Sequence, residues 1–220
     1  MIRTDSTFGP DTPLDIVHLD AHCVVVVKPS GLPSVPGRPA ELHDCAASRI
    51  VRIHADALVV HRLDMATSGL LVFARGADAQ RRLNAAFARR EVEKDYEAIV
   101  DGLLDSDEGE IDLPLGADWP RRPLQKVDRL GGKAALTRYR VLGRDADARR
   151  TRVALSPRTG RAHQLRVHLL AIGHPIVGDT LYAAPPIAAA AARMLLHATA
   201  LRFAHPATGA PVDLRSPAPF

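Results

Sequence analysis

The sequence predicts an α+β fold in which helices and loops flank an extended mixed or antiparallel sheet. Short runs of β-branched residues, bounded by glycine, proline and other turn residues, recur along the 220 residues and are typical of strands. Stretches with apolar residues at helical spacing stand between these runs and are fewer. The composition, 46% hydrophobic and 25% charged, is that of an ordinary globular protein. A chain of this size can bury a substantial core without disulfide bonds.

The first half of the chain begins with a segment rich in threonine, aspartate, proline and glycine. This composition predicts a poorly ordered arm over residues 1–14, followed by a single domain over residues 15–220. A buried strand is expected over His22–Lys28, and the prolines and glycines of Pro29–Arg38 predict a loop after it. The next expected elements are a helix over Glu41–His54, a hairpin with strands over Ala57–Val60 and Leu70–Ala74, and a helix over Gly76–Arg90.

The second half is dominated by strand patterns. Strands are expected over Lys94–Val100, Glu110–Leu115, Ala134–Leu142, Thr151–Leu155, Arg193–Ala198 and Pro211–Arg215. Leu165 and Leu169 share one face of a helix, and the alanine tract Ala188–Ala192 predicts a short surface helix. The basic segment Asp118–Val127 is interrupted by prolines and holds the only tryptophan, so a protruding loop is expected there.

Charge and cysteine content narrow the class of protein. Lys and Arg outnumber Asp and Glu by 29 to 25, and this small excess favours an anionic partner. The two cysteines, Cys23 and Cys45, are too few for a disulfide framework and fit a reducing cytoplasm. Cys23 adjoins an apolar run, which is typical of a buried, unreactive thiol. No apolar run approaches the roughly 18–20 residues that span a bilayer, and no signal peptide is recognisable. We therefore expect a cytoplasmic protein that is not in a membrane.

A polar stretch between two apolar runs carries the first candidate site residues. It ends in Thr67-Ser68-Gly69, residue types that are typical of a turn. Arg62 and Asp64 should therefore lie beside a connection between strands. Such connections often carry catalytic groups, although an aspartate here could equally cap the turn. The segment His61-Arg62-Leu63-Asp64, followed by Thr67–Leu71, resembles the catalytic motif of the RluA family of pseudouridine synthases.

Further segments extend this resemblance over roughly residues 16–216. Val27–Leu32 resembles the K-P-x-G motif of that family, and Lys94-Asp95-Tyr96 resembles its K-x-Y segment. Thr159–His168 matches another family motif nearly letter for letter, and Gly178–Tyr182 is also similar. The resemblance implies the pseudouridine synthase fold. Too few residues precede the similar region to hold the S4-type RNA-binding module of some relatives, so no S4 domain is expected.

The resemblance also implies roles for individual residues. Asp64 would be the catalytic nucleophile and Arg166 its guanidinium partner. Tyr96 would be the tyrosine that stacks on or abuts the target base or assists proton removal from carbon, and the sequence leaves these two roles open. Cleavage of the glycosidic bond of uridine needs an ionised carboxylate, and a guanidinium opposes the rise in pKa that burial would cause. Arg62 would fill the space left by a flipped base. Leu165 is also expected to contact the substrate.

RNA is the expected partner. The basic residues Arg121, Arg122 and Lys126 would contact RNA, and the arginines of Gly76–Arg90 either do the same or form a solvated face. The short chain and the segment Asp118–Val127 look nearest to the dual-specificity member of the family, which modifies a uridine in the tRNA anticodon loop and another in 23S rRNA. We therefore expect stem-loops of tRNA, 23S rRNA or both as substrates, and a monomeric enzyme.

Cofactors are not expected, because uridine and pseudouridine are isomers. The sequence shows no phosphate-binding loop and no dinucleotide motif. The spacing of His163, His168 and His174 is not that of a zinc motif, so no metal ligands are expected. Two alternatives stay open. A non-catalytic RNA-binding protein would need no carboxylate at Asp64, and a glycoside hydrolase would need a second one roughly 5–10 Å away, which neither strong motif supplies.

Overall fold

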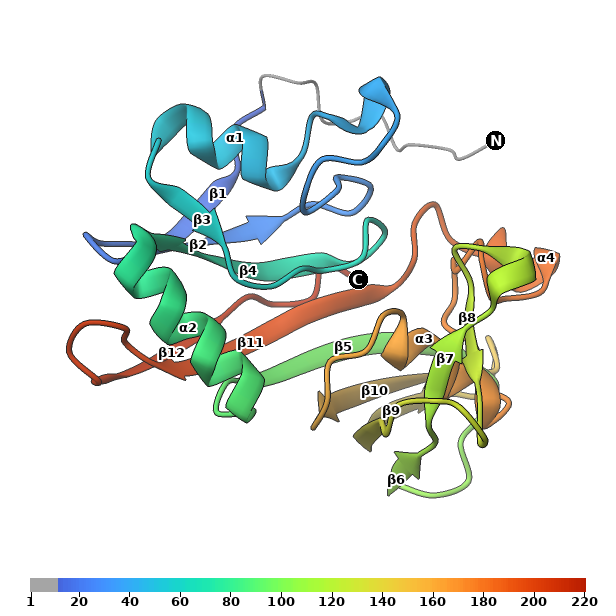
Figure 1. Cartoon of the computed structure of the whole chain (residues 1–220). Helices are drawn as coiled ribbons and strands as arrows, with labels where there is room; N and C mark the ends of the chain where they lie inside the picture. Colours follow the sequence, from blue (N-terminus) through green and yellow to red (C-terminus); the bar gives the residue numbers. More distant parts are fainter. Residues whose placement is uncertain (1–11) are drawn as a thin grey trace. The chain divides into compact units, whose positions relative to one another are not determined.

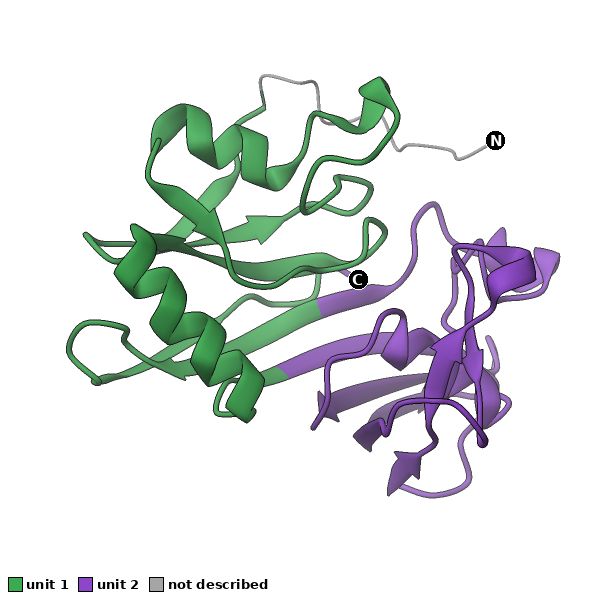
Figure 2. Ribbon diagram, in the orientation of Figure 1, with its two compact units in different colours: residues 1–94, 198–219 green, residues 95–197, 220 purple. Residues whose placement is uncertain are grey.

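The computed structural model describes residues 12–220 and has an α+β architecture (Figure 1). The chain forms two compact units (Figure 2). The first unit holds the chain up to Lys94 together with Ala198–Pro219, and the second holds Asp95–His197 and Phe220. Strands β5 (Glu93–Asp101) and β11 (Leu196–Ala204) each begin in one unit and end in the other. The expectation of a single domain stays a prediction.

The first unit is built on antiparallel strands. Strand β2 (Cys23–Lys28) pairs with β1 (Asp15–Leu19) on one side and β4 (Ser68–Arg75) on the other, and β4 also pairs with β3 (Ala57–Val59). Strand β12 (Pro211–Arg215) pairs with β11. A run of four valines makes β2 a natural strand, and both β2 and β4 are almost entirely buried.

Three helical segments accompany these strands: η1 (Ala40–Leu42), α1 (Ala46–Ile53) and α2 (Ala77–Arg89). One hydrophobic core of the unit is formed by residues of β2, β4 and β11 with the apolar face of α2, including Val25, Val72, Leu83 and Phe203. This core fixes β4, and with it the chain that enters β4 from the candidate site.

The second unit also has an antiparallel sheet, in which β10 (Arg150–Pro157) lies between β5 and β9 (Leu136–Asp145), and β6 (Glu108–Asp112) pairs with β9. Strands β7 (Leu115–Ala117) and β8 (Gln125–Val127) form a separate hairpin, with the 3₁₀ turn η2 (Trp119–Arg121) at its tip. We call Leu115–Val127 the arm. Helices α3 (Gln164–Ala171) and α4 (Pro185–Ala188) complete the unit. Val167 of α3 packs with Leu115 at the base of the arm.

Most of the expected elements are confirmed, and several differ in extent. The helix expected from Glu41 begins only at Ala46, because the Cys45 thiol and Ser48 form a capping box there. The strand expected over Glu110–Leu115 is divided between β6 and β7. The helix expected over Ala188–Ala192 is wrong: α4 ends at Ala188, since alanines alone do not offset the cost of helix nucleation. Strand β1 was not expected.

The segment Asp118–Val127 is more regular than the expected loop. It contains η2 and β8, and the register Ala117–Gln125 pairs β8 with β7. Trp119 at the tip is 66% exposed, so the tip does not belong to a core.

Residues 1–11 of the expected N-terminal arm lie outside the described residues. The rest of that arm is attached to the first unit, because the Thr12 carbonyl accepts a hydrogen bond from Nη1 of Arg49 at 2.8 Å and Leu14 is buried. Cys23 is a buried free thiol, as expected, and Cys45 is buried and free as well. Burial raises the pKa of the Cys23 thiol to about 12. Between residues 12 and 220, no helix is long and apolar enough to cross a membrane.

Candidate active site

Asp64 lies in the short connection between β3 and β4 and is half-buried. Its own carbonyl accepts a hydrogen bond from the Thr67 backbone at 3.0 Å, which forms the turn that the sequence predicted. The turn then enters β4 through Gly69, whose φ is +113°. A side chain at Gly69 would place its Cβ 2.3 Å from the Ala198 carbonyl oxygen of β11, so only glycine lets these two strands approach. The turn is therefore fixed at its exit by backbone packing.

A clamp formed by residues 28–34 holds the backbone on both sides of Asp64. Lys28 is fully buried, and its ammonium donates hydrogen bonds to the carbonyls of Pro29, Leu32 and Met65 at 2.8, 2.7 and 3.1 Å. The Met65 carbonyl also accepts from the Gly31 backbone at 2.8 Å. A buried ammonium is tolerated only when hydrogen-bond acceptors replace its hydrating water. The acceptors of Lys28 come from two loops, the one after β2 and the one that carries Asp64.

Two serines complete the clamp. Ser34 Oγ donates to the Leu63 carbonyl at 2.7 Å and accepts from the Leu63 backbone N–H at 3.0 Å. Ser30 Oγ donates to the Ala66 carbonyl at 2.7 Å. The backbone positions immediately before and after Asp64 are thus held by side chains from a loop about 30 residues earlier, which leaves the carboxylate on a rigid support.

His61 anchors the start of the same segment. Its Nε2 accepts a hydrogen bond from the Val72 backbone at 3.1 Å, and its ring stacks on Phe87 of α2 with centroids 4.7 Å apart. Burial, together with the nearby charge of Lys94, lowers the pKa of His61 to about 3. The imidazole is therefore neutral at ordinary pH and acts as an acceptor that ties the motif to β4. Arg62, next to it, is exposed.

Arg166 lies in the second unit, on α3, and is only 4% exposed. Its Nε and Nη2 bind the two carboxylate oxygens of Asp179 at 2.8 and 2.7 Å, a bidentate pair. Asp179 is held in turn by the backbone N–H groups of Leu181 and Tyr182. A guanidinium has five N–H donors, so this fork fixes the orientation of Arg166 without using all of them.

Tyr182 links Arg166 to the arm. The guanidinium carbon of Arg166 lies 4.9 Å from the Tyr182 ring centroid. The Tyr182 hydroxyl accepts from the Gln125 backbone of β8 at 2.8 Å and is 2.6 Å from Nδ1 of His163. His163 precedes α3 in a left-handed conformation, with φ 53°. One tyrosine therefore joins the arm, the start of α3 and the Arg166 side chain.

Other residues of the motif Thr159–His168 form hydrogen bonds within the second unit. Gln164 bonds to Thr159, to Thr137 and to the Leu136 carbonyl, which fastens the start of α3 to β9. Both ring nitrogens of His168 have protein partners, Thr137 Oγ1 at 2.9 Å and the Leu113 carbonyl at 3.0 Å, and burial lowers its pKa. These contacts account for its burial without a metal ion.

The remaining predicted residues lie apart along the chain. Tyr96 is half-buried on β5 and Leu165 is buried on α3, both in the second unit, whereas Asp64 and Arg62 belong to the first. The roles of Asp64, Tyr96, Arg166 and Leu165 therefore stay predictions.

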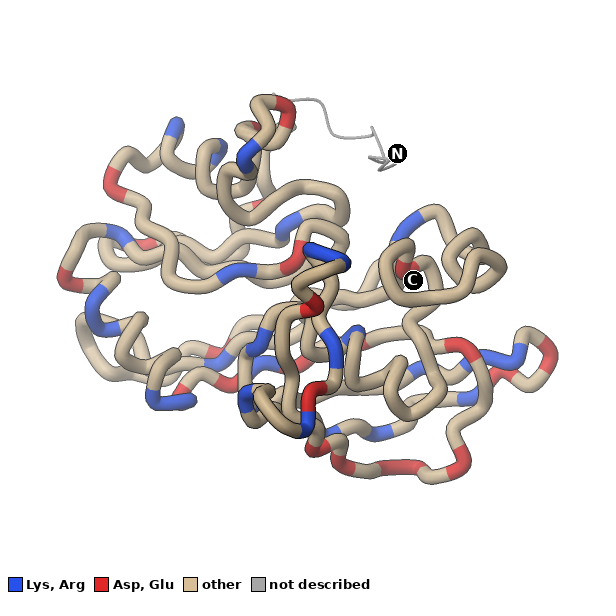
Figure 3. Tube along the Cα trace, turned by 45° about the vertical axis from the view of Figure 1, so that its right-hand side comes forward, with Lys and Arg blue, Asp and Glu red and all other residues tan. Residues whose placement is uncertain are grey.

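The basic candidates for RNA contact differ in their surroundings. On the arm, Arg121 pairs with the buried carboxylate of Asp118, with Nε to Oδ2 2.8 Å, and Arg122 stacks on Trp119 at 3.4 Å from the ring centroid. Lys126 is exposed. On α2, Arg81 pairs with Asp78 and Arg82 donates to the Pro206 carbonyl. Acidic residues lie among the basic ones along the whole described chain (Figure 3). The described chain therefore shows no extended field of one sign.

The family of the chain follows from its similarity to known proteins. Residues 22–171 match the family model described as RNA pseudouridylate synthase. This range includes the motif around Asp64 and the motif Thr159–His168. The chain belongs to this family. Two curated relatives, each named dual-specificity RNA pseudouridine synthase RluA, extend the similarity. The one from Pasteurella multocida is 49% identical over 210 residues, 96% of this chain and 95% of the relative. The one from Yersinia pestis is 52% identical over 205 residues, 93% of this chain and 99% of the relative.

Solved structures agree with the family. Human RNA Pseudouridylate Synthase Domain Containing 1 superposes with a TM-score of 0.81 at 30% identity, over 97% of this chain and 86% of that one. Human RNA Pseudouridylate Synthase Domain Containing 4 gives a TM-score of 0.72 at 26% identity, over 93% and 88%. The expected fold class and family are therefore confirmed. The chain is an enzyme, an isomerase that converts uridine to pseudouridine in RNA, and it is neither a glycoside hydrolase nor a non-catalytic binding protein.

Sequence reasoning missed the residues that support the pseudouridine synthase site. Asp179 and Tyr182 lay in a segment recognised only by resemblance, with no role assigned, and Lys28 was part of a motif without a stated contact. A signal was present for Lys28, because a lysine that ends a run of buried valines must find acceptors. Nothing local identifies Asp179 as the partner of Arg166, since 13 residues separate them.

Proposed function

We propose that this pseudouridine synthase uses Asp64 as its nucleophile. The observation that carries the proposal is the clamp: Lys28, Ser30 and Ser34 hold the carbonyls of Met65, Ala66 and Leu63 around a half-buried carboxylate. The reaction breaks the N1–C1′ bond of uridine, turns the uracil and joins C5 to C1′, while C5 loses a proton and N1 gains one. An ionised carboxylate that is held in place can form a transient bond to a carbon of the nucleotide, and this bond breaks again, restoring the carboxylate, before the product leaves.

Arg166 is proposed as the charge that keeps Asp64 ionised once RNA covers the site. A carboxylate that loses its water becomes harder to ionise, and a nearby guanidinium opposes this shift. The Asp179 fork supports the role, because it fixes the direction of Arg166 in the unliganded protein. Tyr96 is proposed to abut the target base, with Arg62 entering the space that the base leaves and Leu165 packing nearby.

The proposed substrates are RNA stem-loops of tRNA and of 23S rRNA. The support is the near-complete coverage of relatives named dual-specificity RNA pseudouridine synthase. A base in a loop leaves its stack at lower cost than one in a duplex, so a loop is the favoured target. Arg121, Arg122 and Lys126 are proposed to hold the phosphate backbone, with Trp119 exposed beside them. We propose that the enzyme acts as a monomer in the cytoplasm.

The nucleophile is tested by Asp64→Asn, which keeps size and removes the anion. Single-turnover conversion of an anticodon stem-loop and of a 23S rRNA stem-loop should be abolished, while RNA affinity stays within about tenfold, or roughly 1.4 kcal/mol. The control is Asp78→Asn, which changes an exposed aspartate that is 84% accessible and should convert both RNAs normally. Appreciable conversion by purified Asp64→Asn would remove Asp64 from this role.

The arm is tested by the triple change of Arg121, Arg122 and Lys126 to Ala. Each phosphate contact that is lost should flatten the plot of log affinity against log salt by about 0.7–0.9, for target and non-target RNA alike. Conversion at saturating RNA should survive, because the proposed catalytic residues are intact. A slope equal to that of the parent enzyme would exclude the arm from the RNA path and leave the arginines of α2 as candidates.

A further inference from the structure

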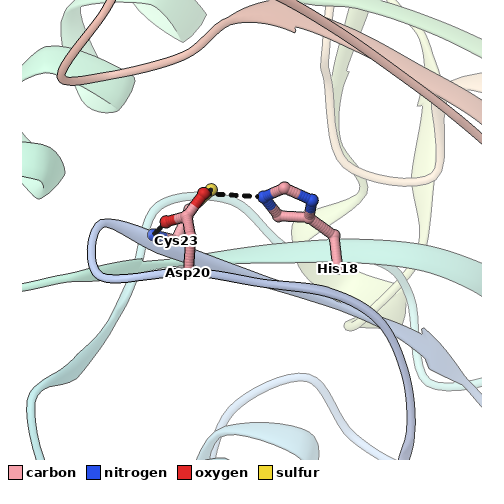
Figure 4. A group of neighbouring side chains, drawn as sticks. All are labelled: His18, Asp20 and Cys23. Carbon is pink, nitrogen blue, oxygen red and sulfur yellow. Dashed lines mark hydrogen bonds and ion pairs between the residues drawn. The ribbon is translucent and has the colours of Figure 1, made fainter.

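A histidine, an aspartate and a cysteine converge at the turn between β1 and β2 (Figure 4). Nε2 of His18 lies 2.8 Å from Oδ2 of Asp20, and Sγ of Cys23 lies 3.8 Å from the same oxygen. One nitrogen, one oxygen and one sulfur atom thus lie within 4.8 Å of one another, and no other such group occurs between residues 12 and 220. None of these residues belongs to the proposed catalytic set.

We propose that His18, Asp20 and Cys23 bind a divalent transition-metal ion, with zinc as the ion that fits the donor set. Imidazole, carboxylate and thiolate are all zinc ligands, whereas magnesium and calcium prefer oxygen alone. Zinc bonds of about 2.0–2.3 Å at tetrahedral angles separate ligand atoms by roughly 3.3–3.8 Å. The 2.8 Å between His18 and Asp20 lies below this range, and the 3.8 Å between Cys23 and Asp20 lies at its upper end. A shift of about 0.5 Å in the His18 side chain would bring both distances into the range.

The turn holds the ligands in place before any ion arrives. Oδ1 of Asp20 accepts hydrogen bonds from the backbone N–H groups of His22 and Cys23 at 2.7 and 2.9 Å, which leaves Oδ2 facing the other ligands. Cys23 is fully buried at the start of β2 and cannot turn away. The side chains of His18 and Asp20 are 28% and 31% exposed, so an ion can enter from solvent. The site is rigid on one side and open on the other.

His205 supports the carboxylate as a second neighbour of Asp20. Its Nε2 lies 3.0 Å from Oδ2, while its Nδ1 accepts from the backbone N–H groups of Ala207 and Thr208 at 3.3 and 3.2 Å. A ring nitrogen that accepts hydrogen bonds carries no proton, so Nε2 is the ring nitrogen that donates to Asp20. His205 is therefore a donor that orients a ligand, which is a common arrangement around protein metal sites.

Metal binding releases one proton, and the charge of the ion is neutralised by its ligands. The Cys23 thiol releases its proton to solvent and becomes a thiolate, and His18 carries its proton on Nδ1 when Nε2 holds the ion. The two charges of the ion meet one carboxylate and one thiolate. Three protein ligands leave a fourth tetrahedral position for water. The ion would join the end of β1 to the start of β2 within the first unit.

Cobalt reports on this site directly, because a thiolate ligand gives Co²⁺ a charge-transfer absorption in the near ultraviolet. Untagged full-length protein, stripped with EDTA and kept reduced, is titrated with Co²⁺ and then with Zn²⁺. We expect one equivalent of cobalt with the thiolate band, displaced by one equivalent of zinc. Cys23→Ser should abolish the band, and Cys45→Ser, which changes the other buried cysteine, should retain it.

Two histidine variants separate a built site from adventitious binding, and both positions are less buried than Cys23. His18→Ala should weaken cobalt binding at least about tenfold, and His205→Gln should weaken it while leaving the thiolate band intact. The proposal is overturned by the absence of a thiolate band, by a band that survives Cys23→Ser, or by His18→Ala binding cobalt as tightly as the parent. Any of these results would leave His18, Asp20 and His205 as a hydrogen-bonded turn only.

Discussion

Replacement of Lys28 by methionine tests the rigid support beneath Asp64. The change keeps the unbranched stem in its buried position and removes the ammonium that serves three carbonyls. Hydrogen bonds to a charged group contribute about 1.5–3 kcal/mol each, or roughly 5–9 kcal/mol for three. The several kcal/mol that it costs to bury an ammonium are recovered in the variant and offset part of this loss. The net expectation is a loss of about 2–4 kcal/mol in the free energy of unfolding.

The same variant should be less active than its stability implies. The Met65 carbonyl adjoins Asp64, and a displacement of about 1 Å at a reacting group can cost roughly 100-fold in rate. We expect a lower urea midpoint and, under conditions where the variant is folded, a single-turnover rate at least about tenfold below the parent. The control is Lys133→Met, which changes an exposed lysine and should alter neither quantity. An unchanged urea midpoint and rate in Lys28→Met would refute the clamp.

The strands of this fold could be predicted because their signals are local. The four valines of β2 and the Ser-Gly turn that opens β4 each specify a short buried strand with a defined end. The first residues of the helices were harder to predict from the sequence. A thiol is an unusual N-cap, so nothing in a general pattern marks Cys45 as the start of α1.

The supports of the candidate site could not be predicted for a different reason. Lys28 meets Met65 across 37 residues, and Arg166 meets Asp179 across 13 with a change of direction between them. Periodicity and propensity describe neighbours in sequence, whereas these contacts depend on how strands and loops meet in space. The proposed roles of Asp64 and Arg166 came from family resemblance, which names residues without naming what holds them. Geometry adds the missing step: Asp64 is short, polar and partly exposed, and the buried side chains of Lys28 and Ser34 hold the backbone beside it.

Three further changes test other parts of the molecule. Because the pKa of His61 is lowered to about 3 in the folded protein, the unfolded chain takes up the proton first as pH falls, and stability should drop below pH 6.5. Urea titrations at pH 7 and 5 should show about 1–2 kcal/mol more loss in the parent than in His61→Gln, and equal losses would contradict this. Treatment with EDTA should leave conversion unchanged while the RNA stays folded, since isomerisation requires no metal, and a loss restored only by a divalent ion would refute that. Tyr182→Phe keeps the ring against Arg166 and removes the hydroxyl that joins Gln125 to His163. Losing these hydrogen bonds frees strand β8 of the arm at Gln125, at a cost of about 1–2 kcal/mol in stability. RNA should therefore bind several-fold more weakly, with a smaller salt slope, while the rate at saturating RNA changes little because the Asp179 fork still orients Arg166. A fall in that saturating rate with unchanged affinity would show instead that Tyr182 serves the reaction and not the arm.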